Sequence, residues 1–221
     1  MSVAVGALAS ELVARAVDHP RTIVGICGAP GAGKTTLAGL LVAAVNATRP
    51  GTAVAVAMDG FHLAQAIIAV DDRRTRRGAP DTFDAAGYAA LLARLRTSDD
   101  PIVYAPVFDR DLGDPVNAAV AVPRSVRVVV TEGNYLLHPD WVKARAQLDE
   151  VWFLEAPDES VRVEHLIARH VRYGKDLEHA RTWVMSSDEA NAAVVVGYRD
   201  HADRILRWPS WSDDHVRVAG T

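Results

Sequence analysis

The chain of 221 residues contains a single cysteine, Cys27. It cannot form an intramolecular disulfide, and a reducing, cytoplasmic location is expected. No apolar run is long enough to cross a bilayer, so no membrane partner is expected. The first twenty residues lack a basic segment ahead of an apolar core, and they predict an amphipathic helix rather than a signal peptide.

Positive charge is also scarce. Lys and Arg number 24 against 28 Asp and Glu, which gives a formal net charge of −4. This balance argues against a general nucleic-acid-binding surface, and no nucleic-acid partner is expected. Hydrophobic residues make up 49% of the chain, which is enough for a packed core. Neither a repeat nor a break in composition marks a linker, so a single domain over 1–221 is the simplest prediction.

Apolar β-branched segments alternate with helical ones along the chain. This alternation predicts an α/β fold with a mostly parallel sheet between two helical layers. Strands are expected at 22–27, 52–58, 101–107, 125–131, 151–154, 204–208 and 216–218. Helices are expected at 34–48, 85–96, 139–148, 157–173 and 176–202, and residues 108–117 are expected to be a loop rich in turn formers.

The stretch CGAPGAGKTTLAG (27–39) joins the first of these strands to a helix, and it fits the pattern G-x-x-x-x-G-K-[ST]. Glycines let backbone N–H groups converge on phosphate oxygens, and the helix N-terminus adds partial positive charge. ATP and Mg²⁺ are therefore the expected cofactors, with Lys34 on the β- and γ-phosphates and Thr35 on the metal. The expected nucleotide-binding residues here are Gly28, Ala29, Gly31, Ala32, Gly33, Lys34, Thr35 and Thr36.

Two acidic residues follow expected strands. Asp59, in MDGFH (58–62), is placed to accept a proton from an acceptor hydroxyl, although an Asp-Gly pair also forms turns. His62 either touches substrate or packs. Glu132, in VVVTEGNYLL (128–137), is expected to hold Mg²⁺ with Thr35, or alternatively just ends its strand. Asn134 and Tyr135 would then face the same crevice.

The stretch HLIARHVRYGKD (165–176) ends an expected helix and predicts a short mobile lid over about residues 165–180. Arg169, Arg172 and Lys175 lie three apart, and lid arginines could neutralise charge during phosphoryl transfer, with Arg172 expected to contact the nucleotide. Gly174 would allow the bend. The alternative for such a run is a solvated basic face.

Six motifs in order give the chain a family resemblance. They are GAPGAGKTT (28–36), MDGFHL (58–63), RRGAPDTFD (76–84), YAPVFDRDLGDPV (104–116), TEGNYLL (131–137) and RHVRYGKD (169–176). The sequence resembles the uridine kinase, pantothenate kinase and phosphoribulokinase group of P-loop kinases, and within it bacterial nucleoside/nucleotide kinase-like and fructose-transport kinases. The resemblance implies a P-loop kinase fold, Asp59 as catalytic aspartate, Glu132 as the acidic strand-end residue, Arg169 as a lid arginine, and Phe83 beside the acceptor.

The departures from the group concern the acceptor. Arg110 stands where pantothenate kinases have a histidine, and His62 stands where uridine kinases have a tyrosine. A pocket with Asp59, His62, Arg77 and Arg110 is polar and partly cationic, and it suits a polyhydroxylated or anionic molecule such as a sugar or sugar acid. The arginine-rich stretch 73–77 could equally be a solvated loop.

The predicted function is an ATP-dependent small-molecule kinase, with Asp59, Lys34 and Arg169 catalytic and a hydroxyl of a sugar-like or nucleoside-like metabolite as acceptor. Alternatives are pantothenate or uridine kinase activity, or a P-loop ATPase or regulator without an acceptor. The guanine-reading N-K-x-D tetrapeptide of GTPases is absent. Trp208 and Trp211 are expected to pack the C-terminal strands or to form a homodimer contact.

Overall fold

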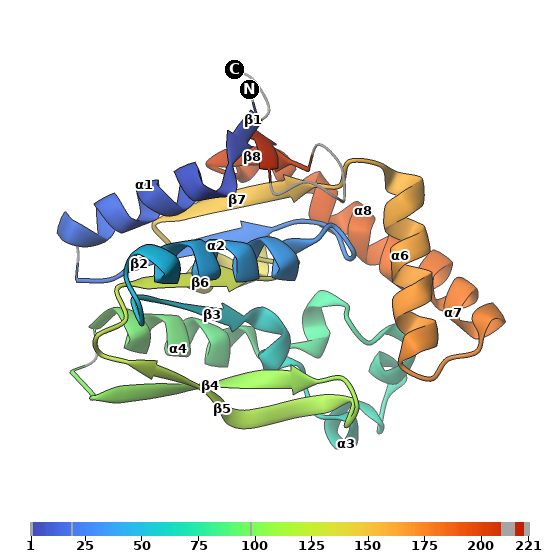
Figure 1. The fold of residues 1–221 in the computed structure, drawn as a ribbon. Coiled ribbons are helices and arrows are strands. Elements are labelled where there is room, and N and C mark those ends of the chain that lie inside the picture. The colour runs from blue at the N-terminus through green and yellow to red at the C-terminus, as the bar shows by residue number, and fades with distance from the viewer. Residues whose placement is uncertain (1, 19, 98, 209–214, 219–221) are drawn as a thin grey trace.

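The computed structural model describes residues 2–18, 20–97, 99–208 and 215–218. In these ranges a seven-stranded sheet runs in the order β1-β9-β8-β7-β2-β6-β3 (Figure 1). The neighbours among β8, β7, β2, β6 and β3 are parallel, whereas β9 and β1 are added antiparallel at one edge. The strands are β1 (Ser2–Ala4), β2 (Thr22–Cys27), β3 (Ala53–Ala57), β6 (Val128–Glu132), β7 (Glu150–Glu155), β8 (Arg204–Arg207) and β9 (His215–Val218).

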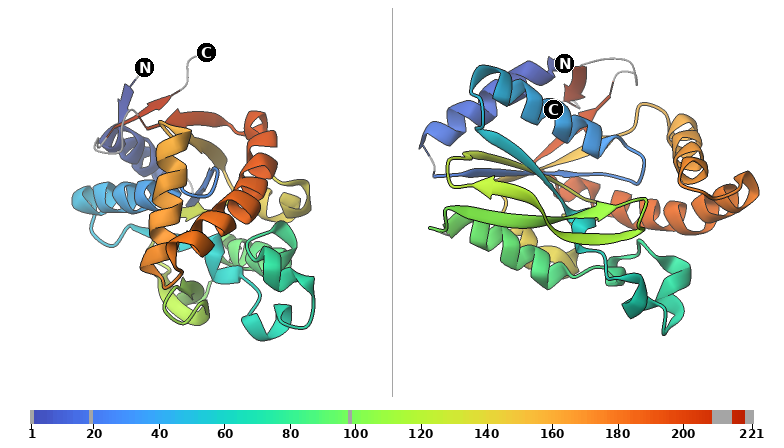
Figure 2. Two further views of the ribbon diagram at one scale, coloured as in Figure 1. Left: turned by 90° about the vertical axis from the view of Figure 1, so that its right-hand side faces the viewer. Right: turned by 60° about the horizontal axis from the view of Figure 1, so that its bottom comes forward.

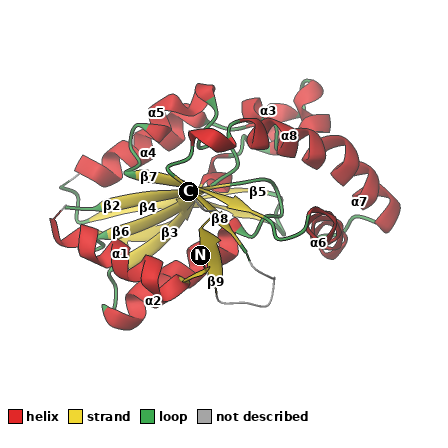
Figure 3. Cartoon of the chain, turned by 90° about the horizontal axis from the view of Figure 1, so that it is seen from above, coloured by secondary structure: helices red, strands yellow, loops and turns green. Residues whose placement is uncertain are grey.

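Helices cover both faces of the sheet. α1 (Val5–Asp18) and α2 (Lys34–Thr48) lie on one side, and α4 (Ala85–Thr97) and α5 (Val142–Arg145) lie on the other (Figure 3). Two buried clusters result, one with Leu8, Leu12, Leu37 and Leu41 and one with Tyr88, Leu92 and Trp141. Strands buried on both faces require the near-continuous apolar sequence seen in β2 and β6. The predicted three-layer α/β fold with a mostly parallel sheet is confirmed.

A helical arm projects beyond the carboxyl ends of the parallel strands (Figure 2). It consists of α6 (Glu159–Arg172), α7 (Leu177–Trp183), a π-helix (Val184–Asp188) and α8 (Glu189–Gly197). Gly174 lies between α6 and α7, as expected. The helical segment expected over 176–202 is helical from Leu177 to Gly197, with the π-helix inside it, and a 3₁₀ turn (Arg199–His201) follows.

The expected strand at 101–107 is not part of the main sheet. β4 (Ile102–Asp109) pairs with β5 (Asp114–Pro123) as a separate antiparallel hairpin, so the expected loop at 108–117 is reduced to a tight turn. The Asp109 carboxylate shapes that turn by accepting from the backbone N–H groups of Asp111 and Leu112. The hairpin packs against the turn that follows β3: a Cβ at Gly60 would lie 2.5 Å from the carbonyl oxygen of Pro106.

Other differences are shifts of boundaries. The helix expected over the first twenty residues begins at Val5, after β1, and α5 is one turn long behind a 3₁₀ turn (Pro139–Trp141). Short elements complete the region around the site: α3 (Gln65–Ile68) and 3₁₀ turns at Met58–Phe61, Asp72–Arg76, Pro80–Thr82 and Arg199–His201. Trp208 packs in the core beneath α1 and α2, whereas Trp211 lies outside the described residues. Within the described ranges, none of the helices combines the length and apolar character needed to span a bilayer.

Candidate active site

The phosphate loop connects the carboxyl end of β2 to the first residue of α2. Gly31 has φ +80°, and a Cβ at this position would lie 2.8 Å from Cγ of Leu166, so a larger residue would both strain the backbone and strike α6. Lys34 is buried, and its ammonium donates to the carbonyl oxygens of Gly28 (2.9 Å) and Ala29 (3.0 Å). Burial lowers the pKa of Lys34, and the negative charges of Glu132 and Asp59 counteract that effect.

Arg162 braces this loop from α6, and the sequence motifs did not reveal it. Its guanidinium donates to the carbonyl oxygen of Pro30 (2.9 Å) and to the carboxylates of Glu159 and Glu189 (2.6 Å each). The side chain is 1% exposed. The arm and the phosphate loop are therefore joined by a buried cation, and α8 is tied in through Glu189.

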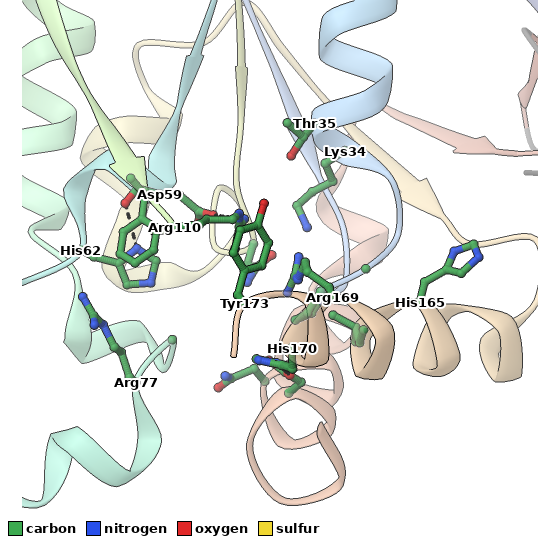
Figure 4. A pocket seen from close by; sticks show the side chains of 18 of the residues that line it. Lys34, Thr35, Asp59, His62, Arg77, Arg110, His165, Arg169, His170 and Tyr173 are labelled. Carbon is green, nitrogen blue, oxygen red and sulfur yellow. Dashed lines mark hydrogen bonds and ion pairs between the residues drawn. The ribbon is translucent and has the colours of Figure 1, made fainter. Parts of the chain in front are cut away.

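A cleft of about 760 Å³ opens between the carboxyl ends of the parallel strands and the helical arm (Figure 4). Many of the residues singled out in the sequence line it together, although they come from six separate stretches of chain. They are Gly31, Gly33, Lys34, Thr35, Thr36, Asp59, His62, Arg77, Phe83, Arg110, Glu132, Asn134 and Arg169. Gly28, Ala29 and Ala32 belong to the loop but are not among the lining residues.

Thr35 and Glu132 offer a pair of oxygen ligands. The Thr35 hydroxyl donates to Oε1 of Glu132 at 3.0 Å, and Glu132 is buried. Burial raises the pKa of Glu132, and the nearby Asp59 charge adds to the shift. Among the described residues, no three His, Cys, Asp or Glu side chains gather as a metal-binding group. Mg²⁺ prefers oxygen ligands and usually keeps phosphate oxygens and water in its shell, so a hydroxyl and a carboxylate fit this ion.

Asp59 lies just beyond the carboxyl end of β3, in the turn Met58–Phe61. Its carboxylate is 3.5 Å from Nη2 of Arg110, which comes from the β4–β5 turn. The Nδ1 of His62 lies 2.8 Å from the Asp59 carbonyl oxygen. The His62 ring packs on Phe83 (4.0 Å between centroids) and Phe108 (4.7 Å). Burial lowers the pKa of His62, which favours the neutral ring.

Arg77 reaches the same end of the cleft from the arginine-rich stretch. Its Nη2 donates to Asp114 at 3.0 Å, and its guanidinium lies 5.2 Å from the centroid of the Phe108 ring. The preceding arginines behave differently: Arg73 and Arg76 form ion pairs with aspartates of their own segment, and Arg74 is exposed. Within the stretch 73–77, Arg77 alone lines the cleft.

The arm closes the cleft with Arg169, in the last turn of α6, and Tyr173, which follows α6 directly (Figure 4). Burial lowers the pKa of Arg169, and repulsion from Arg110 lowers it further. Arg110 also lies 5.8 Å from the centroid of the Tyr173 ring, so it bridges Asp59 and the arm. Arg172 is exposed and lines a smaller hollow of about 360 Å³ beside the main cleft, where its nucleotide contact stays a prediction.

Tyr135 does not line the cleft, and the expectation that it faces the crevice is wrong for its hydroxyl. The ring is buried against Phe83, and the hydroxyl donates to the Gly78 carbonyl oxygen at 2.5 Å. The reason is that the Gly78 carbonyl lies within hydrogen-bonding distance and takes up this hydroxyl. Tyr135 therefore supports the turn that carries Arg77.

The helical arm forms a further wall of the cleft. His170 and Asp188 pair at 2.8 Å, with Asp188 at the end of the π-helix and Asn191 one turn further along. Lys175 lies 4.9 Å from the centroid of the Trp183 ring. All five residues line the cleft. A π-helix is rarely predictable from residue pattern, yet such bulges frequently occur at functional sites.

A phosphate loop, an acidic strand end and a carboxylate facing the loop across a cleft define a P-loop phosphotransferase site. Comparison with models of known protein families gives no match. The chain is 37% identical over 172 residues to "ATP-dependent kinase-like protein notR'" of Aspergillus versicolor, covering 72% of this chain and 99% of that protein. It is 36% identical over 171 residues to "Putative uridine kinase C227.14" of Schizosaccharomyces pombe, covering 72% and 69%.

Solved structures agree with these relatives. A crystal structure from Silicibacter sp. TM1040, named "putative fructose transport system kinase", has a TM-score of 0.79 and 33% identity, covering 94% of this chain and all of that one. The chain therefore belongs to the kinase-like P-loop proteins that these relatives represent, and the predicted resemblance to uridine kinases and fructose-transport kinases is confirmed.

Proposed function

We propose that this protein transfers the γ-phosphoryl group of ATP to a hydroxyl of a small, polar metabolite. The observation that supports this best is that the Asp59 carboxylate and the Lys34–Thr35 phosphate loop line one cleft. The named kinase relatives support ATP as the donor. An ATPase without an acceptor would have no use for the polar wall formed by Asp59, His62, Arg77 and Arg110.

The residues divide the chemistry between them. Lys34 and the loop N–H groups hold the β- and γ-phosphates, and Asp59 orients the acceptor hydroxyl and accepts its proton. The bond between the γ-phosphorus and the β,γ-bridging oxygen breaks as a bond to the acceptor oxygen forms, and ADP leaves. Arg169 neutralises charge on the transferred group from the arm side. A Mg²⁺ ion held by Thr35 and Glu132 would supply further neutralisation of the phosphates.

The experiment is an acceptor screen with nucleosides, pantothenate, ketohexoses, pentoses and sugar acids, read by ADP production. We expect acceptor-dependent ADP release from one chemical class. Lys34→Ala should lower turnover by about 10²-fold or more with the fold intact. The exposed Lys143→Ala serves as matched control. ADP release that no acceptor accelerates would favour an ATPase or regulator, and an unchanged rate in Lys34→Ala would reject the phosphate site.

A further inference from the structure

The Arg77 guanidinium is only partly paired within the described part of the chain. Nη2 donates to Asp114, but Nε is buried and has no hydrogen-bond partner there. The side chain is 19% exposed, whereas its partner Asp114 is 36% exposed and shares its charge with solvent. An unsatisfied buried donor on a charged group costs stability, so a site that retains one usually has a ligand or water to bind.

The surroundings hold Arg77 rigidly in this position. The Phe108 ring supports its planar face, and the turn at Gly78 that follows it is fixed by the Tyr135 hydroxyl. The backbone N–H of Gln65 donates to the same Asp114 oxygen that accepts from Arg77. A guanidinium fixed by stacking and by a carboxylate behind it is pre-organised to bind a planar anion through its remaining N–H groups.

Arg77 and Asp59 lie on two sides of the neutral His62 ring. Asp59, Arg77 and Arg110 all act electrostatically on His62, whose partly buried ring packs between Phe83 and Phe108. A molecule lying over this ring could place an anionic group against Arg77 and a hydroxyl against Asp59. Since Arg77 and Arg110 are each already offset by an aspartate, the local charge suits a monoanion better than a dianion.

Building on the proposed kinase function, we infer that the acceptor is a small hydroxy acid whose carboxylate binds Arg77 while its reacting hydroxyl meets Asp59. Arg77 is then a specificity residue, and it takes no part in the transfer itself. The carboxylate accepts from guanidinium N–H groups of Arg77 that are not bonded to Asp114, at the end of the side chain that lines the cleft, and the Phe83–His62–Phe108 surface contacts the carbon chain.

The test measures binding calorimetrically with the protein saturated with ADP, so that no transfer occurs. The probes are glycerate, erythronate, ribonate, gluconate and pantothenate, each compared with the alcohol in which CH₂OH replaces the carboxylate. The phosphate esters of glycerol and ribitol test the other source of negative charge. We expect at least one acid to bind about tenfold or more tightly than its alcohol and its phosphate ester.

Variants then test whether Arg77 causes the preference for acid over alcohol. Arg77→Gln should remove the preference for acid over alcohol while leaving the Kd for ADP unchanged, and Arg77→Lys should retain part of it. Arg74→Gln, in the same stretch but exposed, should change nothing. If Arg77→Gln does not fold, Arg77→Lys decides, because an ammonium keeps the charge but lacks the planar fork of N–H donors and should bind the acid less tightly.

Three results would overturn the inference: none of the five acids binds, alcohols or phosphate esters bind as tightly as acids, or the Arg77 variants keep the full preference. Phosphoryl transfer to a neutral acceptor would reject the hydroxy-acid inference and support the proposed kinase function. Binding of an acid without phosphoryl transfer in the presence of ATP would support the acid site at Arg77 and reject the kinase function.

Discussion

Replacement of Arg162 by methionine tests whether the helical arm holds the phosphate loop in place. Methionine keeps most of the side-chain volume, so the change removes the charge and its hydrogen bonds with little cavity. The Pro30 carbonyl oxygen loses its partner at 2.9 Å, which costs about 1–3 kcal/mol for a buried acceptor. Glu189, 30% exposed, loses a partner worth about 1–2 kcal/mol, whereas Glu159, 72% exposed, loses about 0–0.5 kcal/mol because solvent screens it.

Removal of a buried charge regains part of this cost, so the expected loss of unfolding free energy is about 2–4 kcal/mol. Urea denaturation followed by circular dichroism should show a midpoint lowered by about 1–2 M. The Kd for ATP should rise about tenfold or more, since Cγ of Arg162 also lies near Gly31 of the loop. The exposed Arg181→Met is the control and should stay within about 0.5 kcal/mol of the parent.

A double-mutant cycle with Glu189→Gln separates the ion pair from general damage. We expect a coupling free energy of about 0.5–3 kcal/mol between Arg162 and Glu189. Stability within about 0.5 kcal/mol of the parent would refute the assigned energetics. A large stability loss with unchanged ATP affinity would show that Arg162 supports the fold without positioning the loop.

Three further predictions concern the cleft. Asp59→Asn should leave the Kd for ATP near that of the parent and lower kcat about 10²-fold or more, and equal kcat would remove its role as base. Glu132→Gln should be more stable than the parent at neutral pH without ligand: because burial raises the folded-state pKa, the parent loses stability as pH rises from the ordinary value of 4.5 towards that pKa. Denaturation curves that differ equally at pH 3 and at neutral pH would contradict this explanation, although kinase activity should fall in the same variant. Burial raises the pKa of Cys27 to about 11, so a thiol reagent should label the native protein only as it opens, and immediate stoichiometric labelling would show that the thiol is accessible.

The nucleotide half of the site was predictable because its geometry is local. β2 and α2 have the predicted bounds, and the glycines between them indicate the backbone conformation that a phosphate loop requires. Thr35 follows from the same pattern, and Asp59 and Glu132 follow from the rule that parallel strands deliver their carboxyl ends to one crevice. These inferences need the chain order of strands and little else.

The hairpin was not predictable on the same grounds. An apolar run such as 102–107 shows that a strand exists but not which strand it pairs with. β5 carries small and exposed residues over 117–119, and turn formers precede it, so the pattern favoured a loop. The position of the hairpin beside the turn after β3 involves the close approach of Gly60 to Pro106, which is a contact between segments far apart in sequence.

The acceptor half of the cleft depends on several such contacts at once. Arg77 pairs with Asp114 of β5, its turn is held by Tyr135 beyond β6, and Arg110 reaches Asp59 from the hairpin. None of these partners is a neighbour in sequence, so the sequence could suggest each residue but could not show where its side chain points. The same separation has a physical consequence: changes in the hairpin can alter which acceptor is bound while the loop, Lys34 and Glu132 keep their geometry. If the proposed function holds, acceptor choice and phosphoryl transfer depend on different parts of this chain, and substitutions at Arg77 and Lys34 should affect different kinetic constants.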